Sequence, residues 1–275
     1  MRHVRPPSPA LGPAAGLPPV LAYSGMSRAW DTEVRREGDS LESPYDAIAQ
    51  LYDPWSRSVT EDVPFYLEEA RAARSSVVEL GVGTGRIALP IARAGVPVVG
   101  VDSSSRMLEV CRERAEQEGL ADLLDLRLGD LRNPPVHGPV KLVVCPFRSY
   151  LHLRTDDDRR EALGSAWKLL EPGGRLAFDV FEPAPDDIAA TQGRWLEREP
   201  GIFERADWDT EARTFTLHVR GPDAETAMEL AWTTAGDWRR LLKETGFEIV
   251  ACYGWFDRRP YRGGEDTIWI ARRPV

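Results

Sequence analysis

The stretch VVELGVGTGR, residues 77–86, decides the fold of this chain. Its apolar start is typical of a buried strand, and its glycines let the backbone turn sharply before a helix. A second apolar run, VPVVGVD at residues 96–102, ends in the carboxylate of Asp102. A strand, a glycine loop, a helix and a second strand that ends in a carboxylate is how an open parallel sheet holds the adenosine part of a cofactor. The sequence therefore predicts a cofactor that contains a nucleoside.

The glycine spacing distinguishes between the nucleoside cofactors. A dinucleotide site needs a glycine or alanine three places after the second glycine, and Arg86 occupies that place here. Gly81 and Gly83 leave the backbone bare against a ligand, and Glu79 places a negative charge beside the loop. That charge repels a pyrophosphate and suits an ammonium group, so the spacing favours a cationic amino-acid nucleoside over NAD.

Six segments, in this order, resemble a class I S-adenosylmethionine-dependent methyltransferase of the small-molecule group that has a β insert after the fifth strand. They are YDAIAQLYDPW (45–55), ELGVGTGR (79–86), GVDSSSRML (100–108), GDLR (129–132), PFRSYLHL (146–153) and LEPGGRLAFDVFEP (170–183). The resemblance covers residues 44–183 and continues more weakly to the C-terminus. It implies an α/β fold: a Rossmann-like, seven-stranded, mostly parallel sheet with helices on both faces and an N-terminal helical lid. It also implies S-adenosyl-L-methionine as the cofactor.

Composition limits the partners that the chain can have. With 275 residues, 42% of them hydrophobic, the chain is long enough for one α/β domain with a small appended unit. The net charge of −9 disfavours a nucleic-acid substrate, because phosphate binding needs a basic face. We therefore expect a small-molecule acceptor. The three cysteines lie far apart and the four histidines show no ligand spacing, so the sequence predicts neither a disulfide framework nor a metal site.

The N-terminal residues 1–40 are rich in Pro, Gly, Ala and Ser and then charged, so we expect a disordered tail. Prolines interrupt its start before the apolar core of a secretory signal could form, and Met26 is an alternative start. No run of apolar residues is long enough to span a membrane. We expect a cytoplasmic protein without a membrane partner.

The remaining chain is predicted to form one domain with an insert. Residues 41–183 and 236–275 make up the Rossmann-like domain with its lid, and alternating segments at 184–235 predict an inserted antiparallel β subdomain. In the wider family such inserts close over the acceptor or pair two subunits, so a homodimer is one expected assembly. Six of the nine tryptophans lie at or beyond position 195 and would line an acceptor pocket, form an interface or cover the core of the insert.

The predicted cofactor site gathers at the ends of the strands. Asp102 is expected to accept hydrogen bonds from the two ribose hydroxyls; alternatively it caps the helix that starts SSSRMLEV, for which Ser103 could serve instead. The resemblance places Asp130 and Leu131 against the adenine, and a solvated loop is the alternative. The predicted cofactor-binding residues are Tyr45, Glu79, Gly81, Gly83, Thr84, Gly85, Asp102, Ser103, Met107, Asp130, Leu131, Pro146 and Phe147.

Catalysis is expected after the strand at 140–147, where ligands of open parallel sheets bind. His152 is the predicted general base, because imidazole has a suitable pKa to take a proton as the methyl group arrives. It could instead donate to a backbone carbonyl or orient a tyrosine of the lid. Tyr52 is the second predicted catalytic residue; alternatively Tyr45 and Tyr52 are core residues of an amphipathic helix.

Three residues are predicted to contact the acceptor: Arg148, Tyr150 and Trp255. Arg148 stands where relatives commonly carry a small polar residue, so it could bind a carboxylate or phosphate of the acceptor, or pair with the acidic run at 156–158. Asp179, in the strand RLAFDVFEP, is interpreted as structural.

The predicted function is transfer of a methyl group from S-adenosylmethionine to an O or N atom of a small molecule, with proximity and orientation as the main source of catalysis. A non-catalytic S-adenosylmethionine-binding regulator and a nucleotide-dependent oxidoreductase are the alternatives. The sequence does not identify the acceptor.

Overall fold

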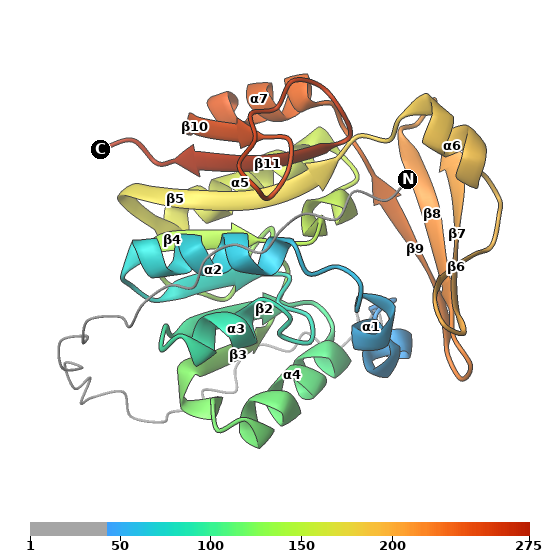
Figure 1. Ribbon diagram of the computed structural model, residues 1–275. Helices are drawn as coiled ribbons and strands as arrows, with labels where there is room; N and C mark the ends of the chain where they lie inside the picture. The colour runs from blue at the N-terminus through green and yellow to red at the C-terminus, as the bar shows by residue number, and fades with distance from the viewer. Residues whose placement is uncertain (1–42) are drawn as a thin grey trace, which may run out of the picture. The chain divides into compact units, whose positions relative to one another are not determined.

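The computed structural model describes residues 43–275, and the predicted disordered tail and the alternative start at Met26 lie outside them. A seven-stranded sheet, sheet A, has the strand order β10-β11-β5-β4-β1-β2-β3 (Figure 1). Its strands are β1 (Val77–Leu80), β2 (Val98–Asp102), β3 (Leu124–Leu128), β4 (Val140–Cys145), β5 (Leu170–Phe181), β10 (Glu248–Tyr253) and β11 (Asp266–Arg272). β11 is antiparallel to both of its neighbours, and the other pairs are parallel. The predicted seven-stranded, mostly parallel sheet is confirmed.

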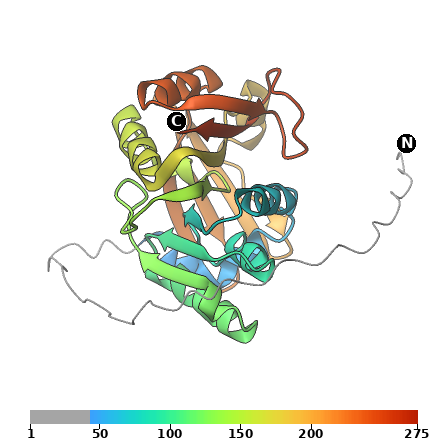
Figure 2. The same ribbon diagram turned by 90° about the vertical axis from the view of Figure 1, so that its left-hand side faces the viewer.

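Helices cover both faces of sheet A, as predicted. The first group is α2 (Asp62–Ala73), α3 (Ala88–Arg93) and α4 (Ser105–Gln117), and the second is α5 (Asp156–Leu169) and α7 (Ala235–Glu244). Successive residues of a strand point to opposite faces. Accordingly Leu142 and Val144 of β4 pack with the first group, whereas Val143 and Cys145 pack with the second. Figure 2 shows the teal α2 and the yellow-green α5 on opposite sides of the sheet.

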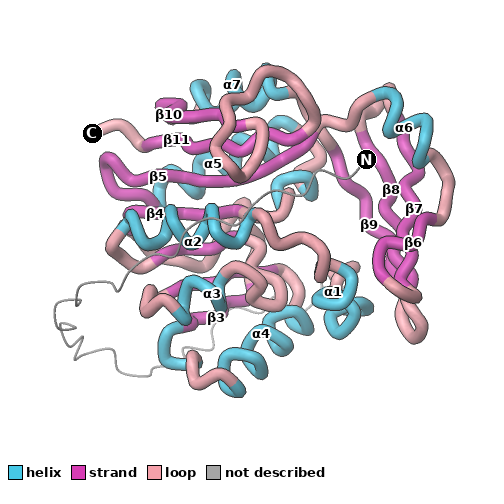
Figure 3. The backbone as a smooth tube through the Cα atoms, viewed as in Figure 1, coloured by secondary structure: helices cyan, strands magenta, loops and turns pink. Residues whose placement is uncertain are grey.

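The insert forms a second sheet, sheet B, beyond the carboxyl ends of the parallel strands (Figure 3). Its antiparallel strands are β6 (Leu196–Glu199), β7 (Ile202–Asp209), β8 (Thr214–Arg220) and β9 (Glu225–Ala231). Trp208 lies opposite Phe215, and Ala206 lies opposite Leu217, so these apolar side chains share one face. The short helix α6 (Pro185–Thr191) precedes the sheet and was not expected from the sequence.

The lid comprises the 3₁₀ helix η1 (Asp46–Ile48) and the helix α1 (Ala49–Trp55). The Ser104 hydroxyl donates to Asp46 over 2.6 Å, which ties η1 to the start of α4. The indole nitrogen of Trp55 donates to Glu204 of β7 over 3.2 Å, which ties α1 to sheet B. The predicted helical lid is therefore present and bridges both sheets.

Two further 3₁₀ helices, η2 (Ala121–Leu123) and η3 (Ser149–His152), follow α4 and β4. Among residues 43–275, the structure contains no helix that is both long and apolar enough to cross a membrane.

Candidate functional site

The glycine loop leaves its backbone bare because side chains would not fit there. Gly81 has a φ of +74° and Gly83 a φ of +55°, a region that favours glycine. A Cβ atom on Gly81 would lie 2.6 Å from the Ser149 hydroxyl oxygen, and one on Gly83 would lie 3.3 Å from the end of Met107. Glycine is therefore required at both positions, and the loop presents bare backbone there.

The carboxylate of Asp102 stands beside this loop at the end of β2. It accepts hydrogen bonds from the backbone N–H of Gly83 (2.8 Å) and of Ser104 (2.9 Å). Burial raises the pKa of Asp102, and these backbone donors oppose that rise. The N-cap of α4 is Ser104, whose hydroxyl accepts from the Met107 N–H over 3.0 Å. The alternative in which Asp102 or Ser103 caps this helix is wrong, because Ser104 has the extended backbone that a cap needs.

A first cavity of about 360 Å³ opens over the loop. Nine predicted cofactor-binding residues line it: Tyr45, Gly81, Gly83, Asp102, Ser103, Met107, Asp130, Leu131 and Phe147. Tyr52, which was predicted to be catalytic, also lines this cavity. The structure adds lining residues that the sequence did not indicate: Ser43, Pro44, Val101, Gly129, Arg132, Ser149, Leu153, Arg154 and Asp158.

Four predicted cofactor-binding residues do not line the cavity. The Thr84 hydroxyl donates to Asp53 over 2.6 Å, and a Cβ on Gly85 would meet the sulfur of Cys111 at 2.7 Å, so both positions serve the packing of the loop. The carbonyl of Pro146 accepts from the Ser149 hydroxyl over 2.8 Å. Their predicted contacts with the cofactor stay predictions.

Glu79 is the fourth of these residues, and it is almost fully buried at 1% exposure. One of its carboxylate oxygens, Oε2, has no hydrogen-bond partner among the described residues. Burial raises the pKa of Glu79 well above its usual range, and the nearby Arg86 opposes the rise. Within 43–275, Glu79 therefore keeps one acceptor oxygen free next to the glycine loop, and burial favours its neutral form.

Asp130 lies at the adenine end implied by the resemblance, but its carboxylate is already paired. Arg132 binds it over 2.6 Å and also binds Asp158 over 2.8 Å. These contacts lower the pKa of Asp130 against the opposing effect of burial. The Asp130 side chain is nearly half exposed, so it remains accessible to an additional donor.

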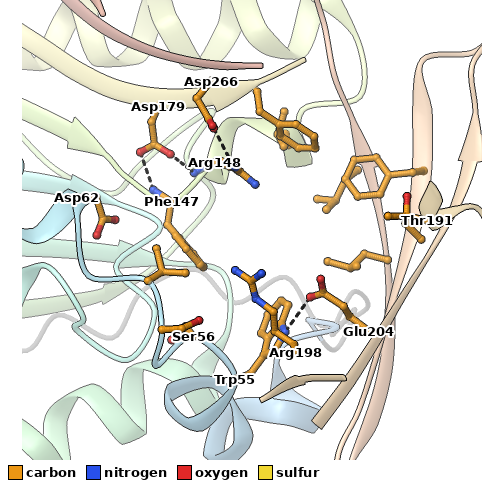
Figure 4. Close-up of a pocket in the computed structure, with 18 of the residues that line it drawn as sticks. Trp55, Ser56, Asp62, Phe147, Arg148, Asp179, Thr191, Arg198, Glu204 and Asp266 are labelled. Atoms are coloured by element: carbon orange, nitrogen blue, oxygen red, sulfur yellow. Dashed lines mark hydrogen bonds and ion pairs between the residues drawn. The ribbon is translucent and has the colours of Figure 1, made fainter. Parts of the chain in front are cut away.

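A second cavity of about 440 Å³ lies between the ends of the sheet A strands and sheet B (Figure 4). Its sheet B wall is mostly apolar and aromatic: Leu196, Ala206, Trp208, Phe215, Leu217 and Leu230. Trp255, which was predicted to contact the acceptor, also lines the cavity with Phe256, and Phe181 packs against Phe215 with ring centroids 6.0 Å apart. This cavity is in the size range of sites for drug-sized ligands.

The two cavities meet at Tyr45, Phe147 and His152, which line both of them. The Tyr45 hydroxyl lies 2.9 Å from Nε2 of His152. Burial lowers the pKa of His152 to about 4 and, with Tyr52 and Asp102 nearby, raises the pKa of Tyr45 well above its usual value. At neutral pH both groups are therefore uncharged, and in the tautomer that carries its proton at Nδ1 the imidazole accepts from the Tyr45 hydroxyl at Nε2.

Asp179 holds the loop that carries Phe147 to this junction. Phe147 and Arg148 have φ values of +55° and +61°, which side-chain-bearing residues rarely adopt. The Asp179 carboxylate accepts from the N–H of Phe147 (2.8 Å), the N–H of Arg148 (3.0 Å) and the hydroxyl of Tyr66 (2.5 Å). Burial, followed by the repulsion from Asp62, raises the pKa of Asp179 to about 6. The structural interpretation of Asp179 therefore misses that this residue also lines the second cavity.

The structure places only some of the predicted acceptor contacts at the second cavity. Arg148 lines the second cavity but pairs with Asp266 over 2.7 Å, not with the acidic run at 156–158. Tyr150 is fully buried, packs on Phe178 and Trp238, and lines neither cavity. The structure therefore does not bring Tyr150 to the site, because its ring fills the core between β5 and α7.

Other charged residues of the second cavity were not indicated by the sequence, because they reach it through the tertiary fold: Glu61, Asp62, Asp179, Arg194, Arg198, Glu204 and Asp266. No group of three or more His, Cys, Asp or Glu residues within 43–275 is arranged to hold a metal ion.

Comparison with known proteins agrees with this geometry. A sequence model of a methyltransferase domain matches residues 77–174. A glycine/sarcosine N-methyltransferase from Halorhodospira halochloris is 27% identical over 251 residues, which cover 87% of this chain and 91% of the relative. The solved structure of the CcbJ methyltransferase from Streptomyces caelestis has a TM-score of 0.76 and 26% identity, and covers 85% of this chain and 99% of that chain.

A structure with S-adenosylmethionine bound shows the same fold. It is CalS10, an amino pentose methyltransferase from Micromonospora echinaspora, with a TM-score of 0.59 and 20% identity over 82% of this chain and 95% of that chain.

Proposed function

Because this chain is a class I S-adenosylmethionine-dependent methyltransferase, we propose that it methylates an N or O atom of a small molecule held in the second cavity. The cofactor would occupy the first cavity. The observation that carries the proposal is that both cavities end at the same three side chains, Tyr45, Phe147 and His152. A donor and an acceptor bound in these cavities would meet there, and nowhere else do the two cavity linings coincide among residues 43–275.

The residues of the first cavity suit S-adenosylmethionine. Asp102 would accept hydrogen bonds from ribose hydroxyls, and the bare backbone of Gly81 and Gly83 would let the amino-acid part lie against the loop. When bound, the cofactor supplies an electrophilic methyl group on a sulfonium.

The residues at the junction would align the acceptor and take up its proton. The aromatic rings of Tyr45 and Phe147 flank the passage between the cavities and keep the acceptor atom in line. His152 is neutral at pH 7, and with its own proton at Nδ1 it would accept a hydrogen bond from the Tyr45 hydroxyl at Nε2. As the methyl group transfers, the proton of the acceptor would pass to the Tyr45 oxygen while the Tyr45 proton passes to His152.

Thermal unfolding with and without ligand tests the cofactor part of the proposal. S-adenosylhomocysteine at about a hundred times its dissociation constant should add about 2.7 kcal/mol, or about 5 to 10 °C in Tm for a chain of this size. Asp102→Asn should lose most of this shift, because a carboxylate oxygen that faces the ribose is replaced by an amide nitrogen.

Asp122→Asn is the matched control, since Asp122 is exposed in η2 and lines neither cavity. A wild-type chain whose Tm responds to NAD and not to the sulfur nucleosides would overturn the proposal. Release of S-adenosylhomocysteine with a panel of small amines and alcohols would then identify acceptors.

A further inference from the structure

We propose that the acceptor combines an apolar body with a carboxylate, and that Arg198 binds this carboxylate at the sheet B side of the second cavity. The inference rests on the proposed function, because it identifies the class of acceptor for the same site. Its first basis is the shape of the cavity. At about 440 Å³ the cavity is far larger than a methyl-accepting atom and a few neighbours require.

The apolar body is indicated by the sheet B wall. Trp208 and Phe215 lie opposite each other on β7 and β8, with their ring centroids 4.3 Å apart, and both line the cavity. Leu217 and Leu230 extend this wall along β8 and β9. Such a surface gains free energy when an apolar or aromatic group covers it.

The carboxylate is indicated by an arginine that lines the cavity and has no ion-pair partner among residues 43–275. Arg198 of β6 lines the cavity, and Figure 4 shows its guanidinium pointing into the open space. The guanidinium makes neither a hydrogen bond nor an ion pair within 43–275, although arginine presents a planar fork that suits carboxylates. Arg194, on the same side, adds a second positive charge while its Nη1 donates to the carbonyl of Ala190 over 3.1 Å.

None of the acidic residues of the cavity forms an ion pair with Arg198 within 43–275, and each makes a different contact. Arg148 binds Asp266, Arg86 binds Asp62, Trp55 donates to Glu204, the backbone of Thr60 donates to Glu61, and the backbone at 147–148 donates to Asp179. Because Arg148 is already paired with Asp266, it is not the main binding site for the carboxylate of the acceptor. Arg198 is therefore the lining guanidinium that makes no hydrogen bond or ion pair within 43–275, whereas Arg194 donates to a backbone carbonyl and Arg148 is ion-paired.

Two probes of nearly equal size test the inference. Indole-3-acetate carries a carboxylate on an aromatic body, and indole-3-acetamide is its neutral counterpart. Calorimetric titration of each probe is carried out at saturating S-adenosylhomocysteine. The dissociation constant of wild type for the acetate should be lower than that for the acetamide by about 10-fold or more. This is the effect expected of one charge-assisted hydrogen bond. Arg198→Gln should lose this preference.

Arg112→Gln is the control, because Arg112 is an exposed arginine of α4 that lines neither cavity, and it should keep the preference. Equal binding of both probes by wild type, a preference that survives in Arg198→Gln, or no binding of either probe would overturn the inference. Titration of each variant with S-adenosylhomocysteine shows whether the variant is folded. The same titration of wild type separates the proposed function from the inference about the acceptor. Absence of that binding in wild type contradicts the proposed function, whereas its presence without a carboxylate preference contradicts the inference alone.

Discussion

At the scale of single residues, burial decides what His152 can do. An exposed imidazole titrates near neutrality, but the enclosed position of His152 between the two cavities lowers its pKa to about 4. A neutral imidazole is the form that can accept a proton, but a pKa of about 4 makes His152 a weaker base at neutral pH than was predicted from the sequence. The Tyr45 hydroxyl fixes which ring nitrogen is engaged.

This predicts a specific pH dependence. The imidazole signals of His152 in a nitrogen-detected NMR titration should show no transition between pH 6 and 7 and should shift only near pH 4. Because the pKa of this group is lower in the folded state than in the unfolded state, its contribution to stability is lost as the pH falls from about 6.5 toward 4. His152→Gln lacks this contribution, so the difference in unfolding free energy between wild type and variant should shrink over that range.

The same variant tests the catalytic assignment. His152→Gln should lower the rate of S-adenosylhomocysteine formation by about 10²-fold or more, a larger effect than on cofactor affinity, as expected for loss of a general base. An unaffected rate in His152→Gln would show that alignment alone drives methyl transfer. A titration of His152 near pH 6.5 in wild type would contradict the buried environment assigned to its imidazole.

At the scale of elements, the lid is held to the glycine loop by one carboxylate. Asp53 of α1 accepts from the Thr84 hydroxyl (2.6 Å) and from Nη1 of Arg114 (2.7 Å), and the same Arg114 nitrogen donates to the Thr84 carbonyl (3.0 Å). Thr84 is fully buried, although Asp53 and Arg114 are partly exposed. The loop that faces the cofactor and the helix that covers it are thus one connected unit.

Asp53→Ala should therefore weaken cofactor binding without touching the cavity lining, which does not include Asp53. We expect the dissociation constant of S-adenosylhomocysteine to rise about 10-fold, since the lid loses hydrogen bonds worth about 1 to 2 kcal/mol. Calorimetric titration measures the change. Asp125→Ala, which removes a similarly paired carboxylate from β3, should bind as wild type does; a loss of affinity in both variants would mean that the lid contact is not the cause.

The strands and helices of sheet A could be predicted from the sequence because local sequence patterns determine them. Apolar runs and glycines at 77–102 and at 140–181 predicted the strands and helices of sheet A, because fully buried parallel strands and their loops leave clear local signals. Asp179 and Arg198 left no such signal. Asp179 acquires its role from a loop 31 residues or more away in the chain, and Arg198 reaches the cavity only because sheet B folds over the ends of sheet A.

At the scale of the whole molecule, the lid connects the two cavities. It contacts the glycine loop through Asp53, the start of α4 through Asp46, and sheet B through Trp55 and Glu204. The second cavity is bounded by sheet B and the lid, so whatever orders the lid also completes the acceptor site. Cofactor binding and acceptor binding should consequently be coupled, with the lid as the shared element.

Hydrogen exchange followed by mass spectrometry tests this coupling. S-adenosylhomocysteine should slow exchange in the lid, residues 46–55, and also in β7, which does not line the first cavity. Trp55→Phe keeps an aromatic ring but removes the indole donor to Glu204, so it should retain protection in the lid and lose it in β7. Protection of β7 that persists in this variant would mean that another contact transmits the effect, and a wild-type β7 that does not respond would show that the two cavities bind their ligands independently.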